Sequence, residues 1–286
     1  MNKKLKTLAK ILISIALFYL VFTKIDTNQI ISIFKKSNPF FIALAFISFI
    51  VSQIISSFRL NYIFHKNDFT LTQISNLKLY FVGMFYNFFI PGGVGGDAYK
   101  VYILNKEFDW NVKSLTKCVF VDRLIGLFAI VFLMLIFGNA IFLNTNLSWF
   151  LILPILALFF FCSKFLLQKI IKDTSKIYNS SFVLSIIIQL FQITTVICLI
   201  LGFGFNTIHI IQFCFVFLLS SILSVVSFAG FGSREYVFLQ AASFLNTSDS
   251  NATSIALGFN IITAIVALLG ILFIILKLNL KTINTN

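Results

Sequence analysis

Six ionisable residues stand beside or within long apolar segments of this chain: Asp97, Lys100, Asp122, Arg123, Arg234 and Glu235. Charged side chains are costly inside a membrane, and those that occur there usually line a path for a substrate or an ion. We therefore interpret the arginines as ligands for an anionic head group and the carboxylates as candidate carriers of a coupling proton. The alternative is mutual neutralisation or snorkelling to the interface. For Lys100 we expect the role of an interface anchor.

The composition predicts a polytopic membrane protein. Of 286 residues, 59% are hydrophobic, only 11% are charged, and 38 are Phe. Globular domains carry about 25% charged residues, so soluble enzymes are excluded, as are disordered chains, collagens and disulfide-rich mini-proteins. The 22 Lys and Arg residues outnumber 9 Asp and Glu and stand mostly in short loops. This is the positive-inside pattern, and it favours contact with anionic lipid head groups over nucleic acid.

Six apolar runs are long enough, or nearly long enough, to span a membrane: 8–23, 39–58, 118–142, 147–168, 181–203 and 252–276. The first is expected to be a retained helix, because no small-residue cleavage site follows it. Residues 25–37 are expected to form an amphipathic helix at the membrane surface. Arg59 falls in an expected cytoplasmic loop, 59–78. The predicted fold is an all-α transmembrane helical bundle, with residues 1–286 forming one domain.

Two further apolar segments, 77–103 and 208–245, are interrupted by glycines. If each dips into the membrane and returns, both termini are cytoplasmic and most basic residues lie inside. The two halves, about 1–142 and 143–286, then have the same order of elements and opposite orientation. This is the inverted-topology repeat found in many transporters. A full crossing remains the alternative, especially for the second segment, where a helix over 209–228 would reach about 30 Å.

The breaks themselves read PGGVGGD over 91–97 and AGFGSRE over 229–235. Glycine runs and Pro91 end helices, and the freed backbone groups must be buried in protein or hydrated. A new helix is expected after each break, with Asp97 or Ser233 as its N-cap. Two helix N-termini that reach inward would favour a phosphate group. The alternative is tight helix packing with ordinary caps.

Several other motifs are excluded. The segment 91–101 does not match a P-loop or the dinucleotide-binding glycine pattern, and the chain has no H-E-x-x-H sequence. His65 and His209 are expected to be structural. The cysteines have no C-x-x-C spacing and are expected to be small buried apolar residues. They are Cys118, Cys162, Cys198 and Cys214. We expect no cofactor, no metal and no catalytic residue, so the chain is not expected to be an enzyme.

The segments around the breaks resemble the flippase-like membrane domain of lysylphosphatidylglycerol synthetases and their stand-alone relatives. The matching segments are 85–97 (FYNFFIPGGVGGD), 121–126 (VDRLIG) and 230–235 (GFGSRE). Lys100 stands where an arginine is common, and Ser227-Phe-Ala stands where relatives often carry a proline. The resemblance implies movement or handling of lipids. Because the sequence shows no soluble aminoacyl-transferase domain, we do not expect lysyl transfer.

These observations predict an inner-membrane lipid translocase for an anionic or phosphate-bearing lipid, either a phospholipid or a polyprenyl-linked one. The alternatives are a membrane accessory or transferase in lipid-linked glycan synthesis, or a non-transporting partner of such a synthase. Expected partners are membrane lipids and a lipid-modifying synthase, not nucleic acid. The predicted substrate-binding residues are Asn87, Gly93, Gly95, Gly96, Asp97, Asp122, Arg123, Gly230, Gly232, Ser233, Arg234 and Glu235.

Overall fold

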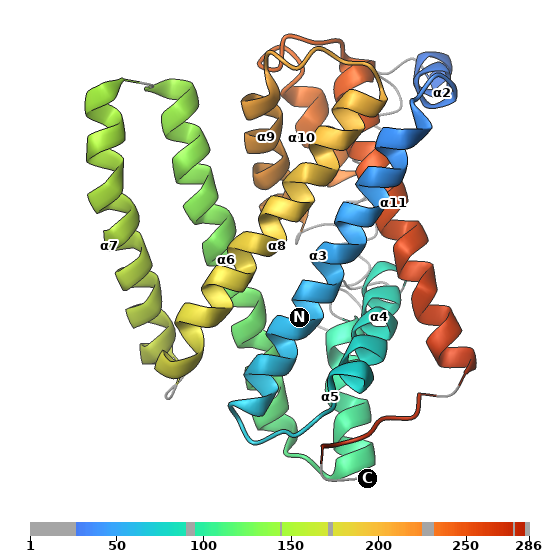
Figure 1. Cartoon of the computed structure of the whole chain (residues 1–286), viewed down its shortest axis with the longest axis vertical. Coiled ribbons are helices and arrows are strands. Elements are labelled where there is room, and N and C mark those ends of the chain that lie inside the picture. The colour runs from blue at the N-terminus through green and yellow to red at the C-terminus, as the bar shows by residue number, and fades with distance from the viewer. Residues whose placement is uncertain are drawn as a thin grey trace, which may run out of the picture. The chain divides into compact units, whose positions relative to one another are not determined.

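The computed structural model describes residues 27–89, 95–143, 145–170, 174–224, 232–276 and 278–283. These ranges are helical apart from short connections and one isolated bridge between Leu71 and Thr282 (Figure 1). The helices are α2 (Thr27–Lys35), α3 (Pro39–His65), α4 (Gln73–Phe89), α5 (Gly95–Phe108), α6 (Val112–Phe142), α7 (Asn146–Ile170), α8 (Ser175–Gly202), α9 (Ile210–Leu223), α10 (Ser233–Gln240) and α11 (Asp249–Ile275). The predicted all-α class is confirmed.

Five of these helices, α3, α6, α7, α8 and α11, are long and apolar enough to cross a membrane. Their apolar parts have 23 to 31 residues, which corresponds to roughly 35–46 Å of helix and exceeds a hydrocarbon core of about 30 Å. They coincide with five of the six predicted spans. The remaining prediction, 8–23, lies outside the described residues. The chain is therefore a multi-pass membrane protein.

Each glycine-broken segment contains two shorter helices among its described residues. The first contains α4, with 17 residues, and α5, with 14. The second contains α9, with 14 residues, and α10, with 8. Fourteen residues reach only about 21 Å, so α9 as described is shorter than the 30 Å helix expected over 209–228. None of these four helices is long enough to cross alone, which agrees with the predicted breaks.

The chain divides into two compact units. Unit 1 contains residues 1–51, 86–95 and 191–267, and unit 2 contains 52–85, 96–190 and 268–286. Each unit takes residues from both sequence halves, because α3, α4, α8 and α11 each run from one unit into the other. The units are therefore not the two halves of the predicted inverted repeat, and that repeat stays a prediction.

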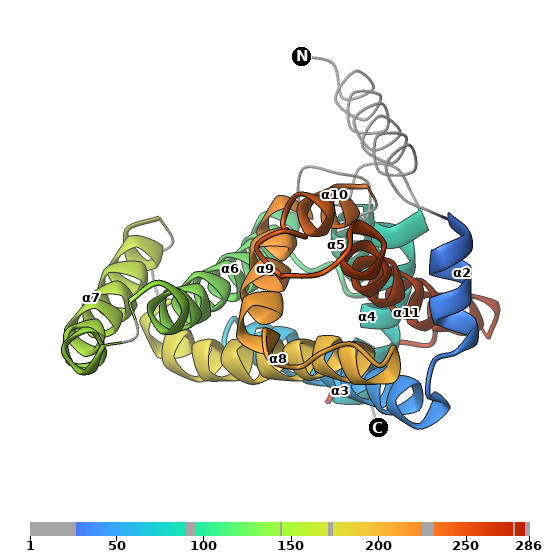
Figure 2. The same cartoon turned by 90° about the horizontal axis from the view of Figure 1, so that it is seen from above.

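The core of unit 2 is built on the C-terminal part of α3 and the helices that pack around it. Leu60, Ile63 and Phe64 of α3 are buried together with Leu104 of α5 and Leu115 of α6. The C-terminal segment 278–283 lies against the α3–α4 connection, where Thr72 donates to the Lys281 carbonyl at 3.0 Å and Ile283 donates to the Thr70 carbonyl at 2.8 Å. Helix α7 packs on α6, and the two form a hairpin (Figures 1 and 2).

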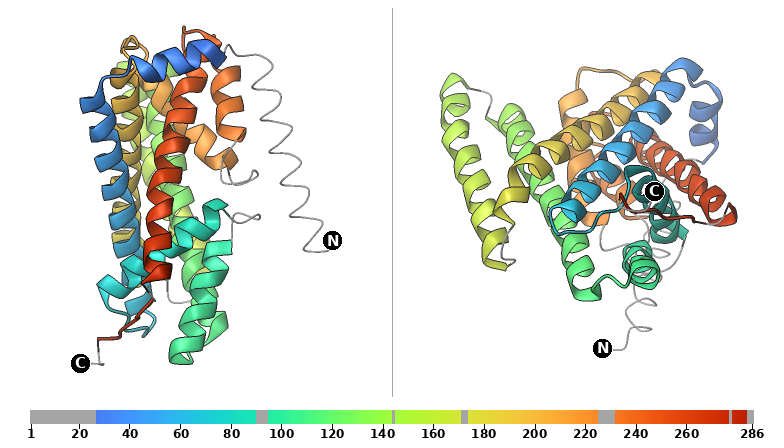
Figure 3. Two further views of the ribbon diagram at one scale, coloured as in Figure 1. Left: turned by 90° about the vertical axis from the view of Figure 1, so that its right-hand side faces the viewer. Right: turned by 60° about the horizontal axis from the view of Figure 1, so that its bottom comes forward.

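Unit 1 holds the second broken segment. Helix α10 packs on α9 (Figures 2 and 3). Phe217 of α9 and Phe49 of α3 both contact the Phe259 ring of α11, with centroid distances of 4.8 and 5.4 Å. The helix predicted over 25–37 is present as α2, whose Ile30 packs against Leu239 of α10, and its location at the membrane surface stays a prediction. The structure therefore places a small amphipathic helix against the helix that follows the second break.

Candidate functional site

The first break is followed by a close contact between α4 and α5. Gly83 and Gly96 pack backbone to backbone, and a Cβ atom on Gly96 would overlap the Gly83 carbonyl group. Only glycine permits this approach, because any side chain would push the helices apart. Since α5 begins at Gly95, Asp97 lies in its first turn. The prediction of Asp97 as N-cap is therefore wrong, because the helix starts two residues earlier.

Asp97 is the centre of an ion-pair cluster. Its two carboxylate oxygens accept hydrogen bonds from Nε and Nη2 of Arg123, at 3.0 and 3.1 Å. Lys100, one turn further along α5, donates to the same carboxylate at 3.2 Å, and its ammonium lies 4.5 Å from the Tyr80 ring centroid. The Lys100 side chain is only 4% exposed. The expectation of an interface anchor is wrong, because this ammonium is buried against a carboxylate and an aromatic ring.

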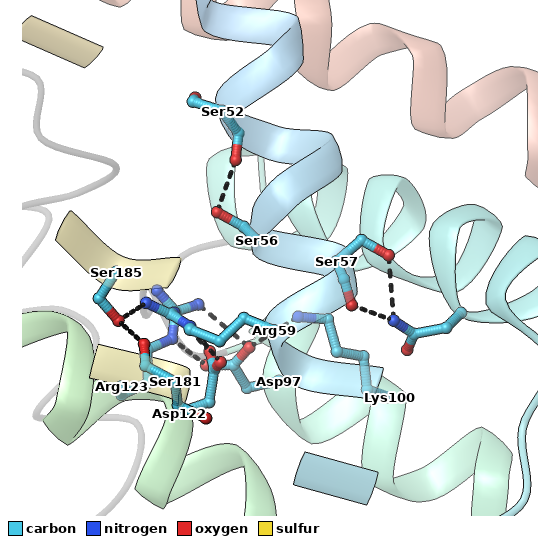
Figure 4. Close-up of polar contacts among 11 residues, drawn as sticks. Ser52, Ser56, Ser57, Arg59, Asp97, Lys100, Asp122, Arg123, Ser181 and Ser185 are labelled. Carbon is cyan, nitrogen blue, oxygen red and sulfur yellow. Dashed lines mark hydrogen bonds and ion pairs between the residues drawn. The ribbon is translucent and has the colours of Figure 1, made fainter. Parts of the chain in front are cut away.

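A second ion pair joins α3 to α6 and was not predicted. Arg59 lies inside α3, since that helix continues to His65, and not in a loop as expected. Its Nε and Nη2 donate to the two oxygens of Asp122 at 2.7 and 3.0 Å, and Nη1 donates to Ser185 of α8 at 2.7 Å (Figure 4). Both side chains of the pair are 8% exposed. Arg59 is therefore a buried residue of the polar cluster.

Gly126 explains how α6 accommodates the Arg59 guanidinium. It stands one turn after Asp122 on the same face of the helix. A Cβ atom there would lie 3.3 Å from Nη1 of Arg59. In the segment 121–126, Asp122 therefore supplies the carboxylate that binds Arg59, and Gly126 leaves space for the Arg59 guanidinium. This is a physical reason for the aspartate and the glycine of that motif.

Asp122 and Arg123 do not neutralise one another. Consecutive residues of a helix point in different directions, and here Asp122 binds Arg59 while Arg123 binds Asp97 (Figure 4). Three basic residues, Arg59, Lys100 and Arg123, meet two carboxylates, so the described cluster carries an excess of one positive charge. The side chain of Arg123 is 55% exposed, whereas those of Arg59 and Lys100 are 8% and 4% exposed.

The second break ends at Gly232, which is the N-cap of α10. Its φ of 77° lies in the left-handed region that favours glycine. Ser233 is therefore the first helical residue, and its prediction as N-cap is wrong. The side chain of Glu235 accepts a hydrogen bond from the Gly232 amide at 2.9 Å and another from the amide of Asn260 on α11 at 2.7 Å. Glu235 is fully buried and joins α10 to α11.

Arg234 lies between two aromatic rings. Its guanidinium carbon is 4.3 Å from the ring centroid of Phe259 and 5.2 Å from that of Phe217. The residue is 8% exposed, and its Nε is buried without a hydrogen-bond partner. Among the described residues, no carboxylate forms an ion pair with it. Stacking on aromatic faces stabilises the cation, while its Nε donates no hydrogen bond among the described residues.

The predicted residues are divided between the two units. Gly96, Asp97, Asp122 and Arg123 belong to unit 2, whereas Asn87, Gly95 and Gly232 to Glu235 belong to unit 1. Asn87 is a partly buried residue near the end of α4, and Gly95 is the first residue of α5. Gly93 and Gly230 lie outside the described residues. Sequence reasoning missed Arg59, Gly83, Phe217, Phe259 and Asn260, because each acquires its role from a contact between distant segments.

The other side chains considered in the sequence have structural surroundings. Cys118, Cys198 and Cys214 are buried as expected, whereas Cys162 is exposed on α7. Nε2 of His65 lies 2.7 Å from the Leu71 carbonyl oxygen. Within the described ranges, no three His, Cys, Asp or Glu residues form a group that could hold a metal ion.

Comparison with known proteins identifies the family. A family model for the lysylphosphatidylglycerol synthase TM region matches residues 7–171. The matched part contains the first break and the Asp122–Arg123 pair, and the second break lies beyond it. No curated protein and no solved structure matches the chain. Because the family match covers more than half of the sequence, the chain belongs to the lysylphosphatidylglycerol synthase TM region family.

Proposed function

We propose that this protein translocates an anionic, phosphate-bearing lipid between the leaflets of the inner membrane. The family relates the chain to lipid synthesis or flipping. The observation that carries the proposal is Arg234, a buried guanidinium that stacks on two phenylalanine rings and has an unpartnered Nε. Such a group is prepared to bind an anion.

The energetics favour a ligand at this position. A cation within a membrane costs several kcal/mol unless an opposite charge or water compensates it. Glu235 is next to Arg234 in sequence, but its two carboxylate oxygens accept hydrogen bonds from Gly232 and Asn260. A phosphate group would supply the missing charge and acceptors, because the planar guanidinium fork matches phosphate oxygens in a bidentate way.

Unit 2 offers a related arrangement at the first break. Arg123 is anchored to Asp97 through Nε and Nη2, and its side chain remains 55% exposed. The excess positive charge of that cluster also favours an anionic group. Each broken segment therefore has an arginine close to the start of its second helix. At α5 this is Arg123 of the neighbouring helix α6, and in α10 it is Arg234 of the same helix. This arrangement supports a carrier that handles a phosphate-bearing head group.

The carrier is proposed to work without covalent chemistry. The sequence contains no P-loop, so a lipid gradient or an ion gradient would supply the driving force. The partners in this proposal are membrane lipids and, for delivery of the substrate, a lipid-modifying synthase. Rocking of helices around a binding site is the general mechanism of such transporters.

Reconstitution in proteoliposomes tests the proposal. Head-group-labelled phosphatidylglycerol and a labelled polyprenyl phosphate would be followed by chemical quenching of the label in the outer leaflet. We expect Arg234→Gln to slow exchange by at least about tenfold, since a lost charge-assisted hydrogen bond costs about 1.5–3 kcal/mol. Arg234→Lys should retain part of the rate. Gln240→Ala, at the exposed end of the same helix, is the matched control and should behave as wild type.

Two outcomes would overturn the proposal. One is equal exchange by wild type, Arg234→Gln and protein-free liposomes for all anionic lipids tested. The other is sugar transfer by the purified protein without any lipid exchange, which would favour the transferase alternative.

A further inference from the structure

Arg59 connects three helices of unit 2 through one side chain. It is 6% exposed within an apolar helix, and three of its nitrogens donate hydrogen bonds. These bonds reach Asp122 on α6 and Ser185 on α8. Ser185 in turn donates to the Ser181 carbonyl at 2.6 Å, so the contact on α8 is fixed by that helix. Arg59 therefore ties three predicted membrane-spanning helices together through one guanidinium group.

The ion pair between Arg59 and Asp122 also affects the orientation of Arg123, the next residue of α6. Asp122 and Arg123 are consecutive, so their side chains leave the helix about 100° apart. The first is held by Arg59, and the second reaches Asp97 on α5. The bidentate bond to Asp122 therefore restrains the rotation of α6 about its axis. That rotation decides whether Nε and Nη2 of Arg123 meet the Asp97 carboxylate.

We propose that Arg59 is a positioning residue for Arg123. By fixing Asp122, it orients α6 so that Arg123 is held at Asp97 with its exposed edge available to an anionic head group. The identity of that ligand rests on the proposed function, whereas the positioning itself does not. Arg59 touches neither Arg123 nor Asp97 through any contact that the structure gives, so it acts through Asp122 and the α6 backbone.

The geometry requires the guanidinium fork, not merely a positive charge. Lysine would keep the charge but could not span both oxygens of Asp122 and the Ser185 hydroxyl in one plane. Arg59→Lys is therefore the informative variant, because it retains charge balance in the membrane. A matched control contacts the same helix from its neighbour: Asn76 of α4 is fully buried and donates to Ser57 of α3 through its side-chain amide. Asn76→Ala loosens α3 without a direct change at α6.

Arginine labelling tests the positioning without any lipid. The arginines of the chain are Arg59, Arg123 and Arg234. Phenylglyoxal modification, quantified by mass spectrometry of the purified full chain, would report the reactivity of each. We expect Arg123 to react at least about fivefold faster in Arg59→Lys, because Asp97 no longer holds it. A change of about fivefold is the lower end of the coupling usually found between two sites of one protein. Its reactivity in Asn76→Ala should equal that in wild type, and Arg234 serves as an internal reference.

An unchanged Arg123 reactivity in Arg59→Lys would overturn the inference. The inference would also be overturned if the reactivity of Arg123 rose equally in Asn76→Ala, or if the reactivities of Arg123 and Arg234 rose together. Either result would indicate a general loosening of the protein. Calorimetric titration with dihexanoyl phosphatidylglycerol then separates the two proposals. If Arg59→Lys binds this lipid about tenfold more weakly and Asn76→Ala binds it with wild-type affinity, the result supports both the positioning role of Arg59 and the proposed function. A faster-reacting Arg123 in a protein whose wild type binds no anionic lipid would leave the positioning intact and contradict the proposed function.

Discussion

Replacement of Asp122 by asparagine tests the buried pair on which unit 2 depends. The change removes the charge that compensates Arg59 and keeps the size of the side chain. Two charge-assisted hydrogen bonds of 2.7 and 3.0 Å are weakened, and the guanidinium stays buried at 8% exposure. Breaking a buried ion pair by removal of one partner costs about 3–5 kcal/mol. We therefore expect Asp122→Asn to lose about that much stability.

Reversible unfolding in mixed micelles with increasing denaturing detergent is the appropriate assay. The double variant Arg59→Met with Asp122→Leu removes both charges and keeps apolar volume, so it should recover most of the loss. Asn76→Ala, which removes a neutral buried contact, should cost only about 1–3 kcal/mol. A loss below about 1 kcal/mol for Asp122→Asn, or a double variant less stable than the single one, would refute the assignment of Arg59 and Asp122 as a mutually compensating pair.

Three further predictions follow from the packing. Gly96→Ala should destabilise the protein by about 1–3 kcal/mol in thermal denaturation, because the new methyl group overlaps the Gly83 carbonyl; a normal melting curve would contradict that contact. Phe259→Ala should slow lipid exchange by roughly tenfold, since it removes the nearer ring from the Arg234 guanidinium; wild-type exchange rates would speak against a role for the stacking. Removal of residues 278–286 should lower the melting temperature by roughly 4 °C or more through lost backbone pairing, and an unchanged temperature would show that this pairing contributes nothing.

The spans were predictable because length and apolar composition alone determine which helices can cross a membrane. The runs 147–168 and 252–276 agree with α7 and α11 to within a few residues. The start of α6 was placed six residues late, because Lys113 and Lys117 interrupt the apolar pattern. The actual start is fixed by Asn111, whose side chain accepts a hydrogen bond from the Ser114 amide at 3.1 Å. Caps of this kind are local and can be found in the sequence, whereas hydropathy alone misses them.

The helix interruptions were predictable for a similar reason, since glycine runs and proline are costly within a helix. The N-caps were not, because the first helical residue depends on backbone geometry. Gly232 adopts a left-handed conformation that no other residue favours, so the cap falls on glycine and not on Ser233. Glu235 then compensates by accepting from the Gly232 amide.

The partners of the buried charges were not predictable from the sequence. Arg59 and Asp122 are 63 positions apart, and nothing in their local surroundings indicates that α3 and α6 meet there. A single arginine at the end of an apolar run is typical of a loop, and Arg59 was accordingly expected in the cytoplasmic loop 59–78. The aromatic rings around Arg234 were equally hidden, because a chain with 38 phenylalanines gives none of them a distinctive signal.

The central claim is that Arg234 meets the phosphate of a membrane lipid, and photo-crosslinking tests it most directly. Phosphatidylglycerol with a diazirine in its head group would be irradiated with the reconstituted protein, and labelled peptides would be identified by mass spectrometry. We predict labelling of α10 and of α11 around Phe259 that unlabelled anionic lipid competes away and that Arg234→Gln abolishes. Label confined to the exposed face of α7, unaffected by competitor or by the substitution, would contradict the claim.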